Sequence, residues 1–160
     1  MPDIPALLER FRRGPELLAV VLTGVFGEEE DFALPGKWTI RQMVAHLADA
    51  ELVGAHRFRQ VIAEDSPALI AFDQDAWVRN LDYARRKPKQ SLETFRRIRA
   101  ENYELLKSLP PEAFERTGNH SLNGRITLVQ MLEGYAQHAE SHARHLQETR
   151  EEYKRVKRKK

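Results

Sequence analysis

Apolar residues recur at spacings of three and four along four long segments of the chain, which is the pattern of amphipathic helices. The pattern predicts helices from Ile4 to about Val25, from Thr39 to about Glu64, from near Ser91 to the Pro110-Pro111 pair, and from Thr127 to about Tyr153. Gly14-Pro15 interrupts the first helix. We expect a kink or a restart there, because proline removes one backbone donor.

Three of these helices begin at recognisable capping residues. Thr39 and Thr127 are each followed three residues later by a glutamine, Gln42 and Gln130, so threonine and glutamine can satisfy each other's backbone N–H groups. Ser91 is the expected N-cap of the third helix. Residues 65–89 form a crossover with a short helix over Asp75 to Tyr83. The crossover is long enough to join helices that are not antiparallel neighbours.

The pattern contains no segment that indicates a strand, so the predicted fold is all-α. We expect one four-helix bundle domain over residues 1–153, followed by a basic tail over residues 154–160. Six of the last seven residues are basic, although the net charge of the whole chain is only +2. The rest of the chain is therefore acidic on balance. A solvated tail is the interpretation that we favour, and binding of nucleic acid by the tail is the alternative.

The composition of the chain indicates where the protein is located and limits the side chains that its chemistry can use. The sequence contains no uncharged apolar run of about 18 residues, and charges occur early in its N-terminal segment, so we expect a cytoplasmic protein without membrane association. The chain has no cysteine. Disulfides, thiolate nucleophiles and Cys-ligated zinc are therefore excluded, and any metal site must use histidine and carboxylate ligands.

The last predicted helix carries an unusual set of residues on its core-facing side. Residues at spacings of three and four form one seam: Leu128, Met131, Tyr135, His138, His142, His145 and Thr149. The first half of the seam is apolar, whereas three histidines follow in the second half. Buried imidazoles without partners cost about 1–3 kcal/mol each. Three of them in succession need a common explanation.

Metal binding is the explanation that we favour. His138 and His142 are four residues apart, so both rings can approach one ion. His46 lies on the apolar side of the second helix and is the expected third ligand. Three protein ligands leave a coordination position open, as in catalytic sites. A lone pair of histidines at this spacing is more often a surface coincidence or a satisfied core pair, but the seam position and His46 favour ligation.

Other polar residues near these positions are candidates for roles beside the ligands. His145 is a candidate for the pocket wall or for a residue that supports the ligands. Asp49 and Glu51 are candidates to accept a hydrogen bond from the distal N–H of a ligating imidazole or to act as a general base for metal-bound water. His56 and His120 are interpreted as ordinary surface residues.

The segments GKWTIRQMVAHLADAE and GRITLVQMLEGYAQHAESHARHLQ, with the helix spacing, resemble the DinB-like superfamily and in particular its YfiT-like branch. The resemblance extends from about Leu7 to Gln147. It implies an up-down-down-up bundle with a long crossover, often dimeric, and a nickel or zinc ion bound by three histidines. The matching positions are His46, His138 and His142.

The resemblance leaves the reaction open. Members of such families resemble thiol transferases that use bacillithiol or related low-molecular-weight thiols, maleylpyruvate isomerases that use mycothiol, or metal-dependent hydrolases. Our leading hypothesis is a metal-dependent enzyme that activates water or a small thiol for attack on a small-molecule substrate. The alternative is a non-catalytic binding or stress-response module in which the metal only fixes two helices together.

Overall fold

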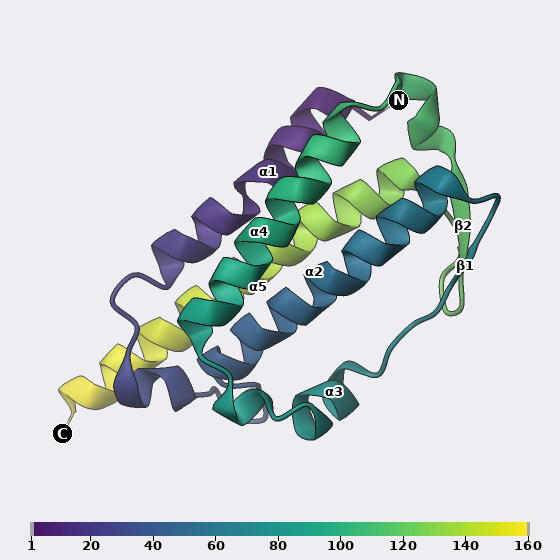
Figure 1. Ribbon diagram of the computed structural model, residues 1–160. Helices are drawn as coiled ribbons and strands as arrows, with labels where there is room; N and C mark the ends of the chain where they lie inside the picture. The colour runs from purple at the N-terminus through teal and green to yellow at the C-terminus, as the bar shows by residue number, and fades with distance from the viewer. Residues whose placement is uncertain (1, 160) are drawn as a thin grey trace.

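The computed structural model describes residues 2–159 and is dominated by four long helices (Figure 1). The long helices are α1 (Ile4–Val21), α2 (Ile40–Ala63), α4 (Pro88–Lys107) and α5 (Leu128–Arg158). Short elements connect them: the helix α3 (Gln74–Asn80), the 3-10 helices η1 (Gly27–Asp31), η2 (Tyr83–Arg85) and η3 (Pro111–Glu115), and the strands β1 (Ala68–Leu69), β2 (Thr117–His120) and β3 (Gly124–Thr127).

The four long helices form the predicted bundle with the predicted crossover. Helices α1 and α5 run in one direction and α2 and α4 in the other (Figure 1). Each helix packs on two others, α1 on α4 and α5, and α2 on α4 and α5. Because α2 and α4 are parallel, the chain must return along the length of the bundle between them, and residues 64–87 make this crossover.

Both predicted capping boxes form. The Thr39 hydroxyl accepts a hydrogen bond from the Gln42 N–H, and the Gln42 side chain accepts one from the Thr39 N–H. Thr127 and Gln130 make the same pair of bonds at the start of α5. The N-cap prediction for Ser91 is wrong. Helix α4 begins at Pro88, because a proline at the first helical position has no N–H to satisfy, and Ser91 is buried within the helix.

Helix α1 does not restart at Gly14-Pro15, because a side chain from another helix replaces the missing hydrogen bond. Pro15 cannot donate to the carbonyl of Phe11, four residues earlier. The Arg99 Nη1 atom of α4 donates to that carbonyl instead, at 2.8 Å. Gly14 provides the space, since a Cβ atom there would lie 2.7 Å from Arg99 Nη1. Gly14 and Pro15 thus form a site on α1 that accommodates the Arg99 side chain, and we call this site the arginine socket.

Arg99 also forms the central ion pair of the bundle. It donates to both carboxylate oxygens of Glu51 on α2, at 2.6 and 2.8 Å, and to the carbonyl of Tyr135 on α5 at 3.1 Å. The side chains of Arg99 and Glu51 are each only 1% exposed. The guanidinium lies over the rings of Phe11 and Phe95. One side chain of α4 thus contacts all three other long helices.

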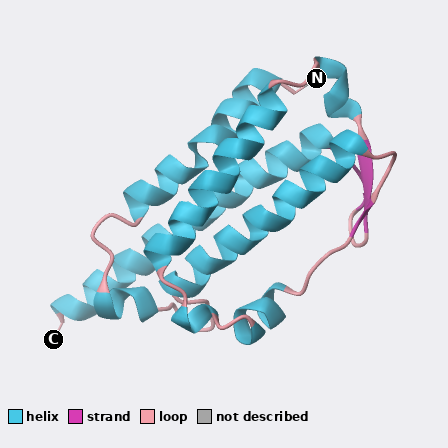
Figure 2. Cartoon of the chain, viewed as in Figure 1, coloured by secondary structure: helices cyan, strands magenta, loops and turns pink. Residues whose placement is uncertain are grey.

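The prediction of a bundle without strands missed a small sheet at one end of the molecule (Figure 2). Strand β1 pairs in parallel with β2, and β2 pairs antiparallel with β3. Gly124 has a φ of 70°, as the tight turn of this hairpin requires. With two to four residues each, the strands are too short to leave a readable alternation in the sequence. The sheet ties the crossover to the loop before α5.

The predicted helix ends also differ from those observed. Helix α1 ends at Val21, four residues before the expected end, and α5 continues past Tyr153 to Arg158. Most of the segment that we interpreted as a basic tail is therefore helical. Lys157 pairs there with Glu28 of η1, and Arg155 pairs with Glu152. Within residues 2–159, no helix combines the length and the apolar character needed to cross a membrane.

The arginine socket makes a prediction about two glycines. Gly14→Ala should lower the free energy of unfolding by about 1–3 kcal/mol, because the added methyl group collides with Arg99 and approaches Ala139. Gly134→Ala, in α5, meets nothing within 4 Å and should raise the free energy of unfolding by up to about 1 kcal/mol. Urea unfolding of both variants measures the difference. Similar effects of the two substitutions would contradict the socket.

Candidate metal centre

The structure brings His46, His138 and His142 together, and we call these residues the histidine triad. One ring nitrogen from each lies within 4.8 Å of the other two. His46 comes from the N-terminal half of α2, and the other two come from successive turns of α5. His46 Nε2 and His138 Nε2 are 3.1 Å apart. Within residues 2–159, this is the one group of three or more potential ligands with such geometry.

The triad fits a divalent transition metal. Two nitrogens that each lie about 2.0–2.1 Å from one ion are roughly 2.9–3.4 Å apart in octahedral or tetrahedral geometry, and the observed 3.1 Å falls in that range. The rings do not form a satisfied core cluster. His46 Nδ1 and His142 Nδ1 are buried and have no hydrogen-bonding partner among residues 2–159. Ligation would offset part of the cost of burying these rings.

Burial keeps all three imidazoles in the form that binds metal. Desolvation lowers the pKa of His46 and of His142 to about 4, in each case as the largest effect. The pKa of His138 falls further, first because of desolvation and then because of the neighbouring His142, His46 and Arg99. All three rings are thus neutral at pH 7. Metal binding does not have to displace a proton from an imidazolium.

The two candidate carboxylates are already paired with arginines. Asp49 accepts a hydrogen bond from the Tyr83 hydroxyl at 2.6 Å and is bound by the guanidinium of Arg86 at 3.0 Å. Glu51 is held by Arg99 in the ion pair of the bundle core. Neither carboxylate bonds to a triad imidazole, since His46 Nδ1 and His142 Nδ1 have no partner. Both carboxylates therefore have structural partners, and the supporting or basic role that the sequence suggested for Asp49 and Glu51 stays a prediction.

The remaining histidines lie at three different places. His145 is exposed, and its ring centroid is 5.8 Å from that of His142, which places it beside the triad as a wall residue. His56 is exposed on α2, as expected. His120 was interpreted as a surface residue, but it is half-buried and lines a cavity. No local pattern in the sequence indicates that His120 lines a cavity, because the hairpin that positions it was not predicted.

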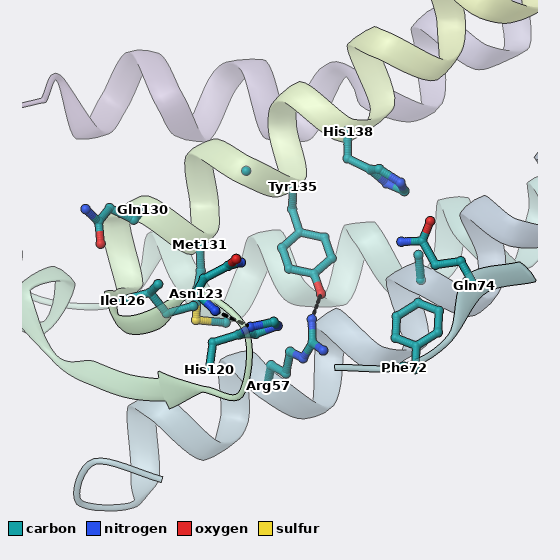
Figure 3. A pocket seen from close by; sticks show the side chains of 12 residues that line it. Arg57, Phe72, Gln74, His120, Asn123, Ile126, Gln130, Met131, Tyr135 and His138 are labelled. Carbon is teal, nitrogen blue, oxygen red and sulfur yellow. Dashed lines mark hydrogen bonds between the residues drawn. The ribbon is translucent and has the colours of Figure 1, made fainter. Parts of the chain in front are cut away.

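One cavity adjoins the triad on the side of the sheet, and we call it the hairpin cavity (Figure 3). It has a volume of about 280 Å³. Helices α2 and α5, the crossover and the β2–β3 hairpin supply its walls, and its lining residues include Arg57, Phe72, Gln74, His120, Tyr135 and His138. Gly54 on α2 makes room for the Tyr135 ring, since a Cβ atom there would lie 2.6 Å from it.

A second cavity adjoins the triad farther along α5, and we call it the loop cavity. Its volume is about 410 Å³, and its lining residues include Trp38, Met43, His142, His145 and Glu148. The ring of Trp38 lies against His46, with centroids 4.9 Å apart, and its Nε1–H donates to Asp75 in the first turn of α3. The triad therefore lies between two cavities, with His138 lining one and His142 lining the other.

The triad predicts the metal content of two matched variants. The purified protein should contain about one zinc or nickel per chain, and His142→Ala should lose most of it because two imidazoles bind weakly. His145→Ala, three residues away and outside the triad, should keep it. Mass spectrometry after purification without a nickel column measures both. Equal metal content in the two variants would contradict the assignment of His142.

The lowered pKa values also predict how pH affects the metal-free protein. Because the pKa values of His46 and His142 fall from the ordinary 6.5 to about 4 on folding, the unfolded chain binds more protons below pH 6.5. Stability is therefore full above that pH and falls as the pH decreases towards 4, by up to about 3 kcal/mol per imidazole. Urea unfolding in the presence of a chelator measures the loss between pH 7 and pH 4.5. The triple variant His46→Gln, His138→Gln, His142→Gln should show a shallower dependence, and an unchanged one would refute this account.

Comparison with known proteins shows the family of this chain and its fold. The sequence model of the DinB superfamily matches residues 10–146. A relative from Oceanobacillus iheyensis, named "Putative metal-dependent hydrolase OB0782", is 30% identical over 134 residues, which cover 82% of this chain and 77% of the relative. The Bacillus subtilis protein named "Putative metal-dependent hydrolase YfiT" is 32% identical over 114 residues, which cover 71% of this chain.

The match to YfiT covers 64% of that protein, so the aligned region spans slightly less than two thirds of its length. The solved structure of YfiT from Bacillus subtilis superposes on this chain with a TM-score of 0.90 at 25% identity. That structure is described as having an unusual four-helix bundle topology. The superposition covers 96% of this chain and 90% of that chain. The unusual arrangement of α1, α2, α4 and α5 is thus shared along nearly the whole chain.

Proposed function

This chain belongs to the DinB superfamily, and from that premise we propose that it is a metal-dependent hydrolase of a small-molecule substrate. The observation that carries the proposal is the histidine triad, in which three neutral imidazoles converge between two cavities. The names of the relatives in Oceanobacillus iheyensis and Bacillus subtilis describe the same class of activity. His46, His138 and His142 would hold the metal.

A divalent transition metal with three imidazole ligands and an open position lowers the pKa of a bound water or thiol and so supplies a nucleophile near neutral pH. The residues around the triad provide the environment of the proposed metal site. Burial keeps the triad imidazoles neutral, Trp38 covers His46, and the crossover closes the side of the hairpin cavity. Zinc and nickel are the ions that we expect, since imidazole suits both and cellular supply selects between them.

Hydrolysis of an activated ester tests the proposal. The protein loaded with zinc or nickel should hydrolyse 4-nitrophenyl acetate, and His138→Gln should lower kcat/KM by about 100-fold because the third ligand is lost. His56→Gln, an exposed position on α2, should keep the wild-type rate. If a panel of esters and amides is processed equally slowly by wild type and His138→Gln, the protein is not a hydrolase of this kind.

Transfer of a thiol is a second candidate function, because the triad adjoins two cavities rather than one. His138 lines the hairpin cavity and His142 lines the loop cavity, so two ligands could approach the ion from different sides. A low-molecular-weight thiol such as bacillithiol would then take one cavity and an electrophile the other. Metal-dependent loss of free thiol in the presence of 1-chloro-2,4-dinitrobenzene measures this activity. A rate equal to that of the metal-free protein would exclude it.

The non-catalytic alternative requires a closed coordination sphere around a metal that only fixes α2 to α5. His145 is the candidate for a fourth ligand in that case. Its ring is exposed and does not belong to the triad, which favours an open position. Visible spectroscopy of the cobalt-substituted protein distinguishes the two cases. A spectrum that changes on addition of azide indicates an open position, whereas an unchanged spectrum indicates a closed one.

A further inference from the structure

The hairpin cavity contains one full positive charge that no carboxylate neutralises. Arg57 on α2 is half-buried and donates from Nη2 to the carbonyl of Ile70 and, at 3.4 Å, from Nη1 to the Tyr135 hydroxyl. Among residues 2–159 it forms no ion pair with an aspartate or glutamate. Arg99, with a side chain that is 1% exposed, and Arg150, at 11%, both have carboxylate partners. Arg57 is therefore an arginine whose charge faces a cavity instead of a protein anion.

His120 supplies a second donor at the same end of the cavity. Its Nδ1 atom accepts hydrogen bonds from the backbone N–H groups of Leu122 and Asn123, both at 3.2 Å. A ring nitrogen that accepts hydrogen bonds carries no proton, so the neutral ring holds its proton on Nε2. Burial and the nearby charge of Arg57 both lower the pKa of His120, which keeps the ring in this neutral form. Figure 3 shows the ring of His120 next to Arg57.

The rest of the cavity lining suits an organic anion. Its polar side chains, Gln74, Asn123 and Gln130, are uncharged amides, and none of its lining residues is acidic. Phe72, Ile126 and Met131 provide apolar walls. At the other end, His138 belongs to the triad and lies three residues beyond Tyr135 on α5, an axial distance of about 4.5 Å. A ligand in this cavity can contact Arg57 and the triad at the same time.

From these observations we propose that the hairpin cavity binds small molecules with a carboxylate group, which Arg57 and the Nε2–H of His120 hold at one end while the reacting group lies at the triad. Guanidinium presents paired N–H donors that match the two oxygens of a carboxylate. One guanidinium with one neutral imidazole provides a single positive charge, which matches one carboxylate group better than a phosphate group with two negative charges. This inference names a substrate class for the proposed function and rests on that function only for the reaction at the triad.

Two esters that differ only in the group at the end of the acyl chain test substrate selection. The metal-loaded wild type should hydrolyse the 4-nitrophenyl monoester of glutaric acid with a higher kcat/KM than 4-nitrophenyl pentanoate, which has a methyl group in place of the carboxylate. Arg57→Gln should lower kcat/KM for the anionic ester by about 10–100-fold, and much less for the uncharged one. Arg57→Lys should restore part of the loss. Arg59→Gln, two residues away and outside the cavity, is the matched control.

A binding measurement separates this inference from the hydrolase proposal. Glutarate and its uncharged diamide are titrated into wild type and Arg57→Gln, with and without metal, while the side-chain nitrogen signals of His120 are followed by NMR. Selective binding of glutarate that weakens about ten-fold or more in Arg57→Gln supports the carboxylate site, even if no ester is hydrolysed. Equal binding of acid and diamide, or binding unaffected by Arg57→Gln, overturns it. Tighter binding of phenyl phosphate than of glutarate also overturns it, in favour of a phosphate site.

Discussion

The buried ion pair between Arg99 and Glu51 is the interaction on which the arrangement of the bundle depends. Isolated charges cannot be buried at acceptable cost, so every donor of the guanidinium that points into the core must find an acceptor. Arg99 meets this demand with Glu51 of α2, the Phe11 carbonyl of α1 and the Tyr135 carbonyl of α5. A shift of any of these helices along its axis would leave a buried charge incompletely paired. The ion pair therefore specifies the relative positions of the helices more than it adds to stability.

The same positions bring together the histidines of the candidate metal centre. Glu51 lies five residues after His46 on α2, and Tyr135 lies three residues before His138 on α5. The ion pair thus fixes α2 against α5 about one turn from the place where their histidines meet. The triad itself costs stability, because its buried imidazoles have too few hydrogen-bonding partners. Because the unpaired imidazoles lower the stability of the fold, the helices that carry them must be held in place by other contacts. The hydrogen bonds of Arg99 to Glu51 and Tyr135 hold α2 and α5 together close to the triad.

The crossover between α2 and α4 forms one wall of the hairpin cavity. Parallel α2 and α4 require a long return segment, and this segment passes over the groove between α2 and α5. It is held there by the short sheet and by the hydrogen bond between Trp38 and Asp75. Phe72 and Trp77 stack on each other in the same segment, with centroids 4.4 Å apart. The topology that distinguishes this bundle from a simple antiparallel one is therefore also what encloses the hairpin cavity.

Local sequence patterns predict the features that depend on neighbours within one or two helical turns. These include the starts of α2 and α5 at Thr39 and Thr127, the helical character of the four segments, and the histidine seam of α5, from which His46 followed as the third member of the cluster. Capping and helical periodicity act over three to seven residues, so they can be read directly from the chain.

The long-range partners of the polar residues depend on how the helices pack against one another. Glu51 and Arg99 are 48 positions apart, and Asp49 and Arg86 are 37 positions apart, so no local pattern reveals that arginines occupy both carboxylates. His120 joins the hairpin cavity only because strands of two to four residues pair across the crossover. The carboxylate–arginine pairs and the strand pairs form between segments that are far apart in the sequence. Their free energy depends on burial of charge and on loop closure, and both are set by how the folded chain packs.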